Sequence, residues 1–142
     1  MYTYSYPRPA LTVDAIVLYK KEHQWQLLLV ERKGEPFKGN WALPGGFVNM
    51  DEQLEEACIR ELDEETGVKV GGMEQFYTFG AIDRDPRGRT VSVVYYVFLE
   101  EQQNPKAGDD AAKAVWFALD DLPPLAFDHA KIIEQFRNQV LS

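Results

Sequence analysis

The segment GFVNMDEQLEEACIRELDEETGV, residues 46–68, holds eight carboxylates and a single basic residue, Arg60. Asn49, followed three residues later by Glu52, is typical of a helix start, and Gly67 is well placed to end the helix. The segment therefore predicts an acidic helix of about fifteen residues. Its net charge of −7 accounts for nearly all of the chain's total of −8.

One face of this predicted helix changes from apolar to acidic along its length. At about 100° per residue, the face carries three carboxylates in its last turns: Glu61, Glu64 and Glu65. The earlier turns of the same face carry apolar residues: Leu54, Ala57 and Cys58. Since an apolar face points into the protein, we expect the three carboxylates to point at the domain body. Burying unpaired carboxylates costs several kcal/mol each, so this arrangement predicts a bound cation.

The preceding loop, Pro44-Gly45-Gly46, predicts what completes the site. Glycines let the backbone approach the acidic face, so that carbonyls can join an oxygen shell and N–H groups can face a phosphate. Oxygen donors without His or Cys favour Mg²⁺, with Mn²⁺ as the alternative, over Zn²⁺. Mg²⁺ that bridges phosphate oxygens is typical of phosphate-transfer sites.

Length and composition indicate one soluble domain over residues 1–142, with residues 1–10 as an extended arm. The acidic balance, with a pI near 4.7, argues against nucleic acid and anionic membranes as partners. Without an apolar run of about 18 residues, the chain is expected to be cytoplasmic. The single cysteine, Cys58, is expected to fill the core, the alternative being a nucleophile. The arm packs on its own domain or is exchanged in a homodimer.

Periodicity predicts further elements around the acidic helix. Strands are expected at residues 12–19, 25–30, 73–81, 91–99 and 114–117, the first two forming a hairpin. A last helix is expected after a cap at Asp128, because apolar residues recur there at helical spacing: Ile132, Ile133, Phe136 and Val140.

The acidic segment also matches a known motif. The pattern G-x5-E-x7-R-E-U-x-E-E-x-G-U, with U a bulky aliphatic residue, is filled at every defined position: Gly46, Glu52, Arg60, Glu61, Leu62, Glu64, Glu65, Gly67 and Val68. This pattern is the signature of the Nudix hydrolases, which the chain therefore resembles.

The resemblance implies an α+β fold, an α/β/α sandwich with a mixed central sheet, and hydrolysis of a nucleoside diphosphate linked to another group. In such proteins metals are held by the carbonyl matching Gly45 and by the carboxylates matching Glu61, Glu64 and Glu65. The residue matching Arg60 orients a catalytic carboxylate. The one matching Glu52 supports the join between loop and helix.

Strings outside the motif narrow the expected substrate. Residues 31–33, 36–48, 84–89 and 127–129 resemble those of bacterial ADP-ribose pyrophosphatases, which implies cleavage of ADP-ribose to AMP and ribose 5-phosphate. Similar strings occur in transcription regulators that carry a further winged-helix domain, for which we expect no room after Ser142. Two alternatives stay open: cleavage of a modified nucleoside triphosphate, and sensing of ADP-ribose without cleavage.

Further residues are candidates for binding and catalysis. A general base is expected on a flexible acidic segment, first at Asp109 and Asp110 and second at Glu100 and Glu101. Phosphate or ribose contacts are expected from Arg32, Gly46, Arg84 and Arg87; the alternative for the arginines of the 84–89 loop is pairing with Asp83 and Asp85. Candidates for stacking on adenine, or for the core instead, are Phe37, Trp41 and Tyr77. His129 is expected either to contact a ligand or to form a hydrogen bond at the start of the last helix.

Overall fold

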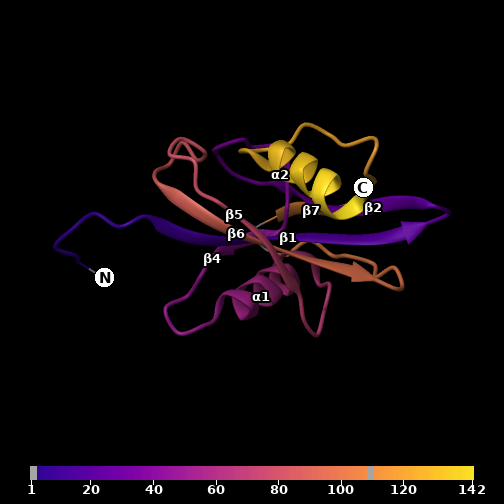
Figure 1. Cartoon of the computed structure of the whole chain (residues 1–142), viewed down its shortest axis with the longest axis horizontal. Helices are drawn as coiled ribbons and strands as arrows, with labels where there is room; N and C mark the ends of the chain where they lie inside the picture. Colours follow the sequence, from indigo (N-terminus) through magenta and orange to yellow (C-terminus); the bar gives the residue numbers. More distant parts are fainter. Residues whose placement is uncertain (1–2, 109–110) are drawn as a thin grey trace.

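The computed structural model describes residues 3–108 and 111–142, which form a mixed sheet covered by one helix on each face (Figure 1). The strands are β1 (Ala10–Lys21), β2 (Gln24–Arg32), β3 (Trp41–Ala42), β4 (Gly45–Phe47), β5 (Glu74–Phe79), β6 (Thr90–Leu99) and β7 (Ala111–Ala118). The helices are α1 (Leu54–Thr66) and α2 (His129–Phe136), which runs into a π-helical turn at Arg137–Leu141. The expected α/β/α sandwich is confirmed.

Strand β1 lies at the centre of the sheet. One edge pairs in parallel with β6 along ten residues, and β5 follows antiparallel to β6. The other edge is shared, because β1 pairs with β4 over residues 12–14 and with β2 over residues 18–21. Beyond Leu18 and Leu27 the strands β1 and β2 therefore diverge, and β2 continues in pairs with β3 and β7. The divergence opens a space between β1 and β2 on the side where β4 lies.

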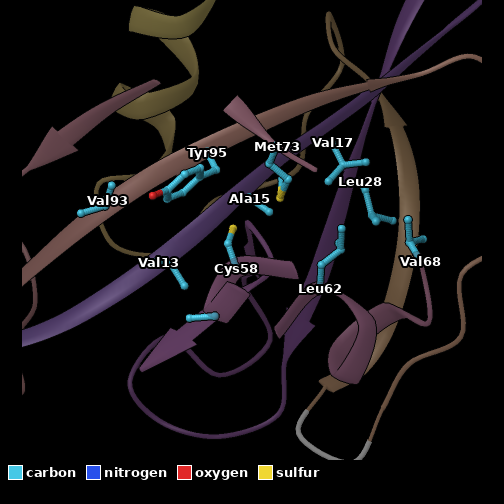
Figure 2. Packing of buried hydrophobic residues seen from close by; sticks show 11 residues of the cluster. Val13, Ala15, Val17, Leu28, Cys58, Leu62, Val68, Met73, Val93 and Tyr95 are labelled. Carbon is cyan, nitrogen blue, oxygen red and sulfur yellow. The ribbon is translucent and has the colours of Figure 1, made fainter. Parts of the chain in front are cut away.

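Alternation along β1 supplies a core to each helix. Val13, Ala15 and Val17 pack with Cys58 and Leu62 of α1, as Figure 2 shows. The intervening residues Ile16 and Leu18 face α2, where they pack with three residues of that helix: Ile132, Ile133 and Phe136. A strand buried on both faces needs a continuous apolar run, which β1 has from Leu11 to Tyr19 apart from Thr12 and Asp14. The assignment of Cys58 to the core is confirmed, and burial raises the pKa of its thiol.

The acidic helix begins later than the sequence predicts. Gly67 ends it in the left-handed conformation, as expected, with φ of 73° and a hydrogen bond from its N–H to the Asp63 carbonyl. The start at Asn49 is wrong, however, because α1 begins at Leu54. The Asn49 N–H donates to Glu52 Oε1 at 2.8 Å, but this bond closes a turn that precedes the helix. Glu52 is also bound by Arg60, so its carboxylate ties that turn to the helix body.

The amino-terminal arm lies apart from the sheet. Residues 3–9 have no regular structure and extend away from the body (Figure 1), while Ala10, expected in the arm, already belongs to β1. Exchange of the arm between two copies stays a prediction. Within residues 3–108 and 111–142, neither helix is long and apolar enough to span a bilayer.

Docking of α2 onto the sheet can be tested at Phe136, which is 1% exposed and contacts the rings of Phe76 and Tyr96 at 5.2 and 5.3 Å. We expect Phe136→Ala to lower the free energy of unfolding by about 3 to 5 kcal/mol, because it leaves a cavity in the core. Urea unfolding measures the loss. The exposed Lys131→Ala on the same helix is the control, with an expected change below about 0.5 kcal/mol. A loss for Phe136→Ala as small as the control's would contradict the assigned packing.

Candidate active site

The space between the diverging strands is a cavity of about 460 Å³. Three chemically different groups line it. Oxygen-rich residues come from β4 and α1: Gly45, Gly46, Glu61 and Glu65. Basic residues come from the end of β2 and from the loop before β6: Arg32, Arg84 and Arg87. A buried polar pair comes from β1 and the start of α2: Asp14 and His129. A pocket of this size is in the range of small-molecule sites.

The two glycines of β4 bring the backbone against the carboxylates of α1. The Gly45 N–H donates to Glu65 Oε1 at 2.7 Å. A Cβ atom placed on Gly46 would lie 2.6 Å from the Glu61 carboxyl group, closer than a side chain allows. The prediction that the glycine loop lets the backbone approach the acidic face is therefore confirmed.

Arg60 joins the loop to the helix through several hydrogen bonds. Its Nε and Nη2 bind the two oxygens of Glu52 at 2.8 and 2.6 Å, and Nη2 also donates to the Phe47 carbonyl at 3.1 Å. Its Nη1 donates to Glu61 at 2.8 Å and to Glu64 at 3.1 Å. The hydrogen bonds with Glu52 raise the pKa of Arg60, and they lower that of Glu52 to about 2. Both groups stay charged over the physiological pH range.

The expectation that all three carboxylates point at the domain body is wrong for Glu64. Its side chain is 59% exposed, against 16% for Glu61, and it lies outside the cavity that Glu61 and Glu65 line. Glu65 lies about 40° from Glu61 around the helix, whereas Glu64 lies about 60° away in the other direction. Glu64 is therefore at the rim of the acidic face, where Arg60 binds it.

The donor chemistry of this face fits a hard divalent cation, because it consists of carboxylates and half-buried glycine backbone. Across residues 3–108 and 111–142, no three His, Cys, Asp or Glu side chains are already gathered as a metal site. Arg60 occupies part of this face, since its Nη1 holds both Glu61 and Glu64. A cation bound there would compete with one guanidinium nitrogen.

The basic group is built on the ring of Phe127. The guanidinium of Arg32 lies 4.9 Å from the centre of this ring, and that of Arg87 lies 5.4 Å from it. Arg32 Nε is fixed by the Pro36 carbonyl at 2.7 Å. Burial, and next the charge of Arg87, lower the pKa of Arg32. Two fixed guanidiniums that repel each other favour an anion between them.

The arginine loop is held by acidic partners. Arg87 pairs with Asp85 at 2.8 Å, as the alternative reading of the sequence expects. Burial disfavours the charge of Asp85, but the hydrogen bonds from Arg87 outweigh it and lower the pKa. Arg84 does not follow that alternative: its side chain is 4% exposed and binds both oxygens of Asp128, at 3.0 and 2.7 Å. Asp128 precedes α2 but makes no side-chain cap bond.

The sequence did not predict two residues of the cavity, Asp14 and Phe127, or the role of a third, His129. Asp14 is buried at 8% exposure and accepts a hydrogen bond from the Ser92 hydroxyl. Phe127, which carries the arginine group, has a φ of 53°. His129, expected at a ligand or in a bond at the helix start, accepts a 3.0 Å hydrogen bond from the Leu43 N–H, and burial lowers its pKa. A lone carboxylate in the apolar run of β1 was the one signal available for Asp14.

The structure tests only one of the two expected pairs of general bases. Asp109 and Asp110 lie outside the described residues; Gly108 just before them donates its N–H to the Glu65 carbonyl at 2.9 Å. The second choice, Glu100 and Glu101, is wrong. These exposed residues follow the far end of β6, and its ten residues span about 30 Å from the cavity residue Thr90.

The stacking candidates separate in the same way. Phe37 contacts the ring of Phe127 at 4.9 Å and is 37% exposed, so it lies beside the arginine group. Trp41 packs on Phe117 at 4.8 Å within the core, which confirms its alternative assignment. Tyr77 lies on β5 with its ring against Phe79 at 5.3 Å and does not line the cavity.

The ion pair between Arg60 and Glu52 predicts a pH-dependent stability. The pKa of Glu52 falls from an ordinary 4.5 to about 2 in the folded protein, so the pair stabilises the fold above about pH 5 and loses this effect as pH falls towards 2. Glu52→Gln should lower the melting temperature near pH 7, and the difference from the unsubstituted protein should shrink below about pH 4. Thermal melts at several pH values measure it. Glu56→Gln, an exposed change of equal charge on α1, should show no such trend; a constant deficit for Glu52→Gln down to pH 2 would contradict the assignment.

Comparison with known proteins agrees with this site. The family model described as the NUDIX domain matches residues 8–136. An ADP-ribose pyrophosphatase of Methanocaldococcus jannaschii is 45% identical over 131 residues, which cover 92% of this chain and 75% of that protein. A Bacillus subtilis protein named as a proposed 8-oxo-dGTP diphosphatase is 50% identical over 128 residues. The match covers 89% of this chain and 80% of that protein.

A solved structure adds a bound ligand to the comparison. The NUDIX domain of Shewanella oneidensis NrtR, crystallised with ADP ribose, superimposes with a TM-score of 0.90 at 38% identity. The match covers 96% of this chain and 91% of that one. Since the family model matches most of the chain, and the motif residues Gly46, Glu61 and Glu65 line one cavity, the protein belongs to the Nudix family.

Proposed function

We propose that the protein hydrolyses the diphosphate of ADP-ribose, giving AMP and ribose 5-phosphate. The observation that carries this proposal is the cavity itself, which joins a face of oxygen donors to a group of fixed arginines. A diphosphate needs both, because cations bind its oxygens and guanidiniums bind the remaining charge. The pyrophosphatase of M. jannaschii and the ADP-ribose complex of the NrtR domain support ADP-ribose as the substrate.

The family uses divalent metals, and we propose Mg²⁺ here, with Mn²⁺ as the alternative. The carbonyl of Gly45 and the carboxylates of Glu61, Glu64 and Glu65 would hold it. When bound, such a cation neutralises the diphosphate and activates a water molecule.

The protein's own residues position the substrate and the proton acceptor. Arg60 orients the carboxylates of Glu61 and Glu64 through its Nη1. Arg32 and Arg87 bind diphosphate oxygens, with Arg84 beside them and the Gly46 backbone facing the phosphate. Asp109 or Asp110 takes the proton of the attacking water, on the segment that follows Gly108.

A second function is favoured by one comparison. The B. subtilis relative suggests cleavage of a modified nucleoside triphosphate, for which the same acidic helix would serve. A panel of ADP-ribose, 8-oxo-dGTP and ATP distinguishes the two, since ADP-ribose gives AMP and a triphosphate gives pyrophosphate. ADP-ribose binding without product would favour the third function, a sensor.

The setting of the protein is proposed in the same way. We expect it to act in the cytoplasm on a nucleoside diphosphate sugar. Because its net charge is negative, we expect neither nucleic acid nor a membrane as a partner. Formation of a homodimer through residues 3–9 is measured by sedimentation of the full chain and of a chain lacking those residues.

Glu64→Gln tests the proposed metal ligands. It removes one charge from an exposed position, so the fold should keep its melting temperature while kcat for ADP-ribose falls at least about 100-fold. Release of AMP is measured at saturating Mg²⁺. Glu56→Gln makes the same chemical change at an exposed position of α1 and should retain full activity. Activity of Glu64→Gln equal to that of Glu56→Gln would show that the metal assignment is wrong.

Gly46→Ala tests the close approach of backbone and carboxylate. The added Cβ would lie 2.6 Å from the Glu61 carboxyl group, which is the mobile end of a side chain and can move away. We therefore expect kcat to fall at least about 10-fold with little change in melting temperature. Gly71→Ala is the control, because Gly71 does not line the cavity and no atom lies within 4 Å of its Cβ position. Full activity of Gly46→Ala would mean that the position of Glu61 is not needed.

A further inference from the structure

Asp14 and His129 face each other at the sheet side of the cavity without a hydrogen bond between them. Oδ1 of Asp14 lies 3.8 Å from Nε2 of His129, beyond hydrogen-bond range. Both residues are more than nine-tenths buried, and both line the cavity. A donor and an acceptor that line a cavity at this separation can both bind a third polar atom placed beside them.

The hydrogen bonds to neighbouring residues determine which atoms of Asp14 and His129 can bind a ligand. The Leu43 N–H donates to Nδ1 of His129, so the ring carries its proton on Nε2, which points at Asp14. The Ser92 hydroxyl donates to Oδ2 of Asp14, which leaves Oδ1 as the oxygen on the His129 side. The site therefore presents one N–H donor and one carboxylate acceptor.

A hydroxyl group fits this pair of atoms. An oxygen placed beside a 3.8 Å gap can lie about 2.8 Å from both atoms, accepting from Nε2–H and donating to Oδ1. A phosphate oxygen has no proton to donate and would be repelled by the Asp14 carboxylate. The neighbouring guanidinium of Arg84 does not offset this repulsion, because Asp128 pairs with it.

The depth of the pair indicates which part of the substrate supplies the hydroxyl. Phe47 lines the cavity, is 50% exposed and has its ring 5.7 Å from the Arg87 guanidinium. Phe37 is 37% exposed and contacts Phe127, the ring that also carries Arg32. A nucleobase is expected at such rings. The phosphates are expected at the arginines and the acidic helix, and the buried pair then remains for the other end of the molecule.

Resting on the proposed function, we propose that Asp14 and His129 form a subsite for a hydroxyl of the sugar on the non-nucleoside side of the diphosphate. The subsite selects nucleoside diphosphate sugars over nucleoside triphosphates, since the latter carry a phosphate where the sugar hydroxyl belongs. Asp14 and His129 act as specificity determinants beside the acidic face of α1, since Asp14 pairs with Gly45, whose N–H binds Glu65.

The test measures binding of two ligands that share the nucleoside half. Calorimetry with Mg²⁺ on the Glu64→Gln protein gives the dissociation constants of ADP-ribose and of AMP, which lacks the second sugar. Asp14→Asn removes the charged acceptor. His129→Asn removes the Nε2 donor but keeps an acceptor for the Leu43 N–H. Each variant should weaken ADP-ribose binding at least about 10-fold and change AMP binding less than twofold.

Other outcomes overturn the proposal in distinguishable ways. Equal weakening of AMP and ADP-ribose would assign the pair to the nucleoside half or to support of the Leu43 segment. Unchanged binding of both ligands by folded variants would mean that only water completes the gap. If one variant fails to melt cooperatively, the other decides between these outcomes. Failure of the protein with native Asp14 and His129 to bind or cleave ADP-ribose would refute the proposed function before either variant is measured.

Discussion

The bonds between Arg60 and Glu52 are the interaction on which the site depends. They join the turn before α1 to the helix body, and the same guanidinium reaches the Phe47 carbonyl of β4 and the carboxylates of Glu61 and Glu64. The Arg60 guanidinium thus fixes the positions of a strand, a turn and a helix relative to one another. Without it, the acidic side chains would repel each other across one turn of helix and the glycine backbone would have no fixed distance to them.

Strand β1 provides the second constraint, because it serves both faces of the sheet. Its odd-numbered residues from Val13 to Val17 anchor α1, and its even-numbered residues face α2. Where β2 diverges from it, the face towards α2 changes from apolar to polar at Asp14. The cavity therefore forms where the sheet is divided, and residues of both helices reach it.

The sequence predicted most of the fold because the signals were local. Runs of β-branched, aromatic and other apolar residues marked the strands, and Gly67 marked the end of α1 through a conformation that few other residues adopt. The carboxylates at Glu61 and Glu65 followed from helical periodicity. Periodicity alone overestimated the acidic face, since Glu64 lies on the outer edge, and the turn at Asn49 resembled a helix start because its hydrogen bond is the same.

What the sequence did not predict depends on contacts between distant residues. Asp14 meets Ser92 across 78 positions, and the Leu43 N–H meets His129 across 86. No local pattern encodes such partners. The assignment of Glu100 and Glu101 as general bases failed for the same reason. The sequence predicted that they follow a strand, but it did not show that this end of the strand lies far from the cavity.

The buried pair of Arg84 and Asp128 has a consequence for how this chain can evolve. Replacing either residue alone leaves an uncompensated charge in the interior, at a cost of about 3 to 5 kcal/mol, which is a large part of a typical domain's stability. A change at one position alone is therefore expected to destabilise the fold, so we expect the two positions to change together. The two positions, 44 residues apart, should therefore be inherited as a unit.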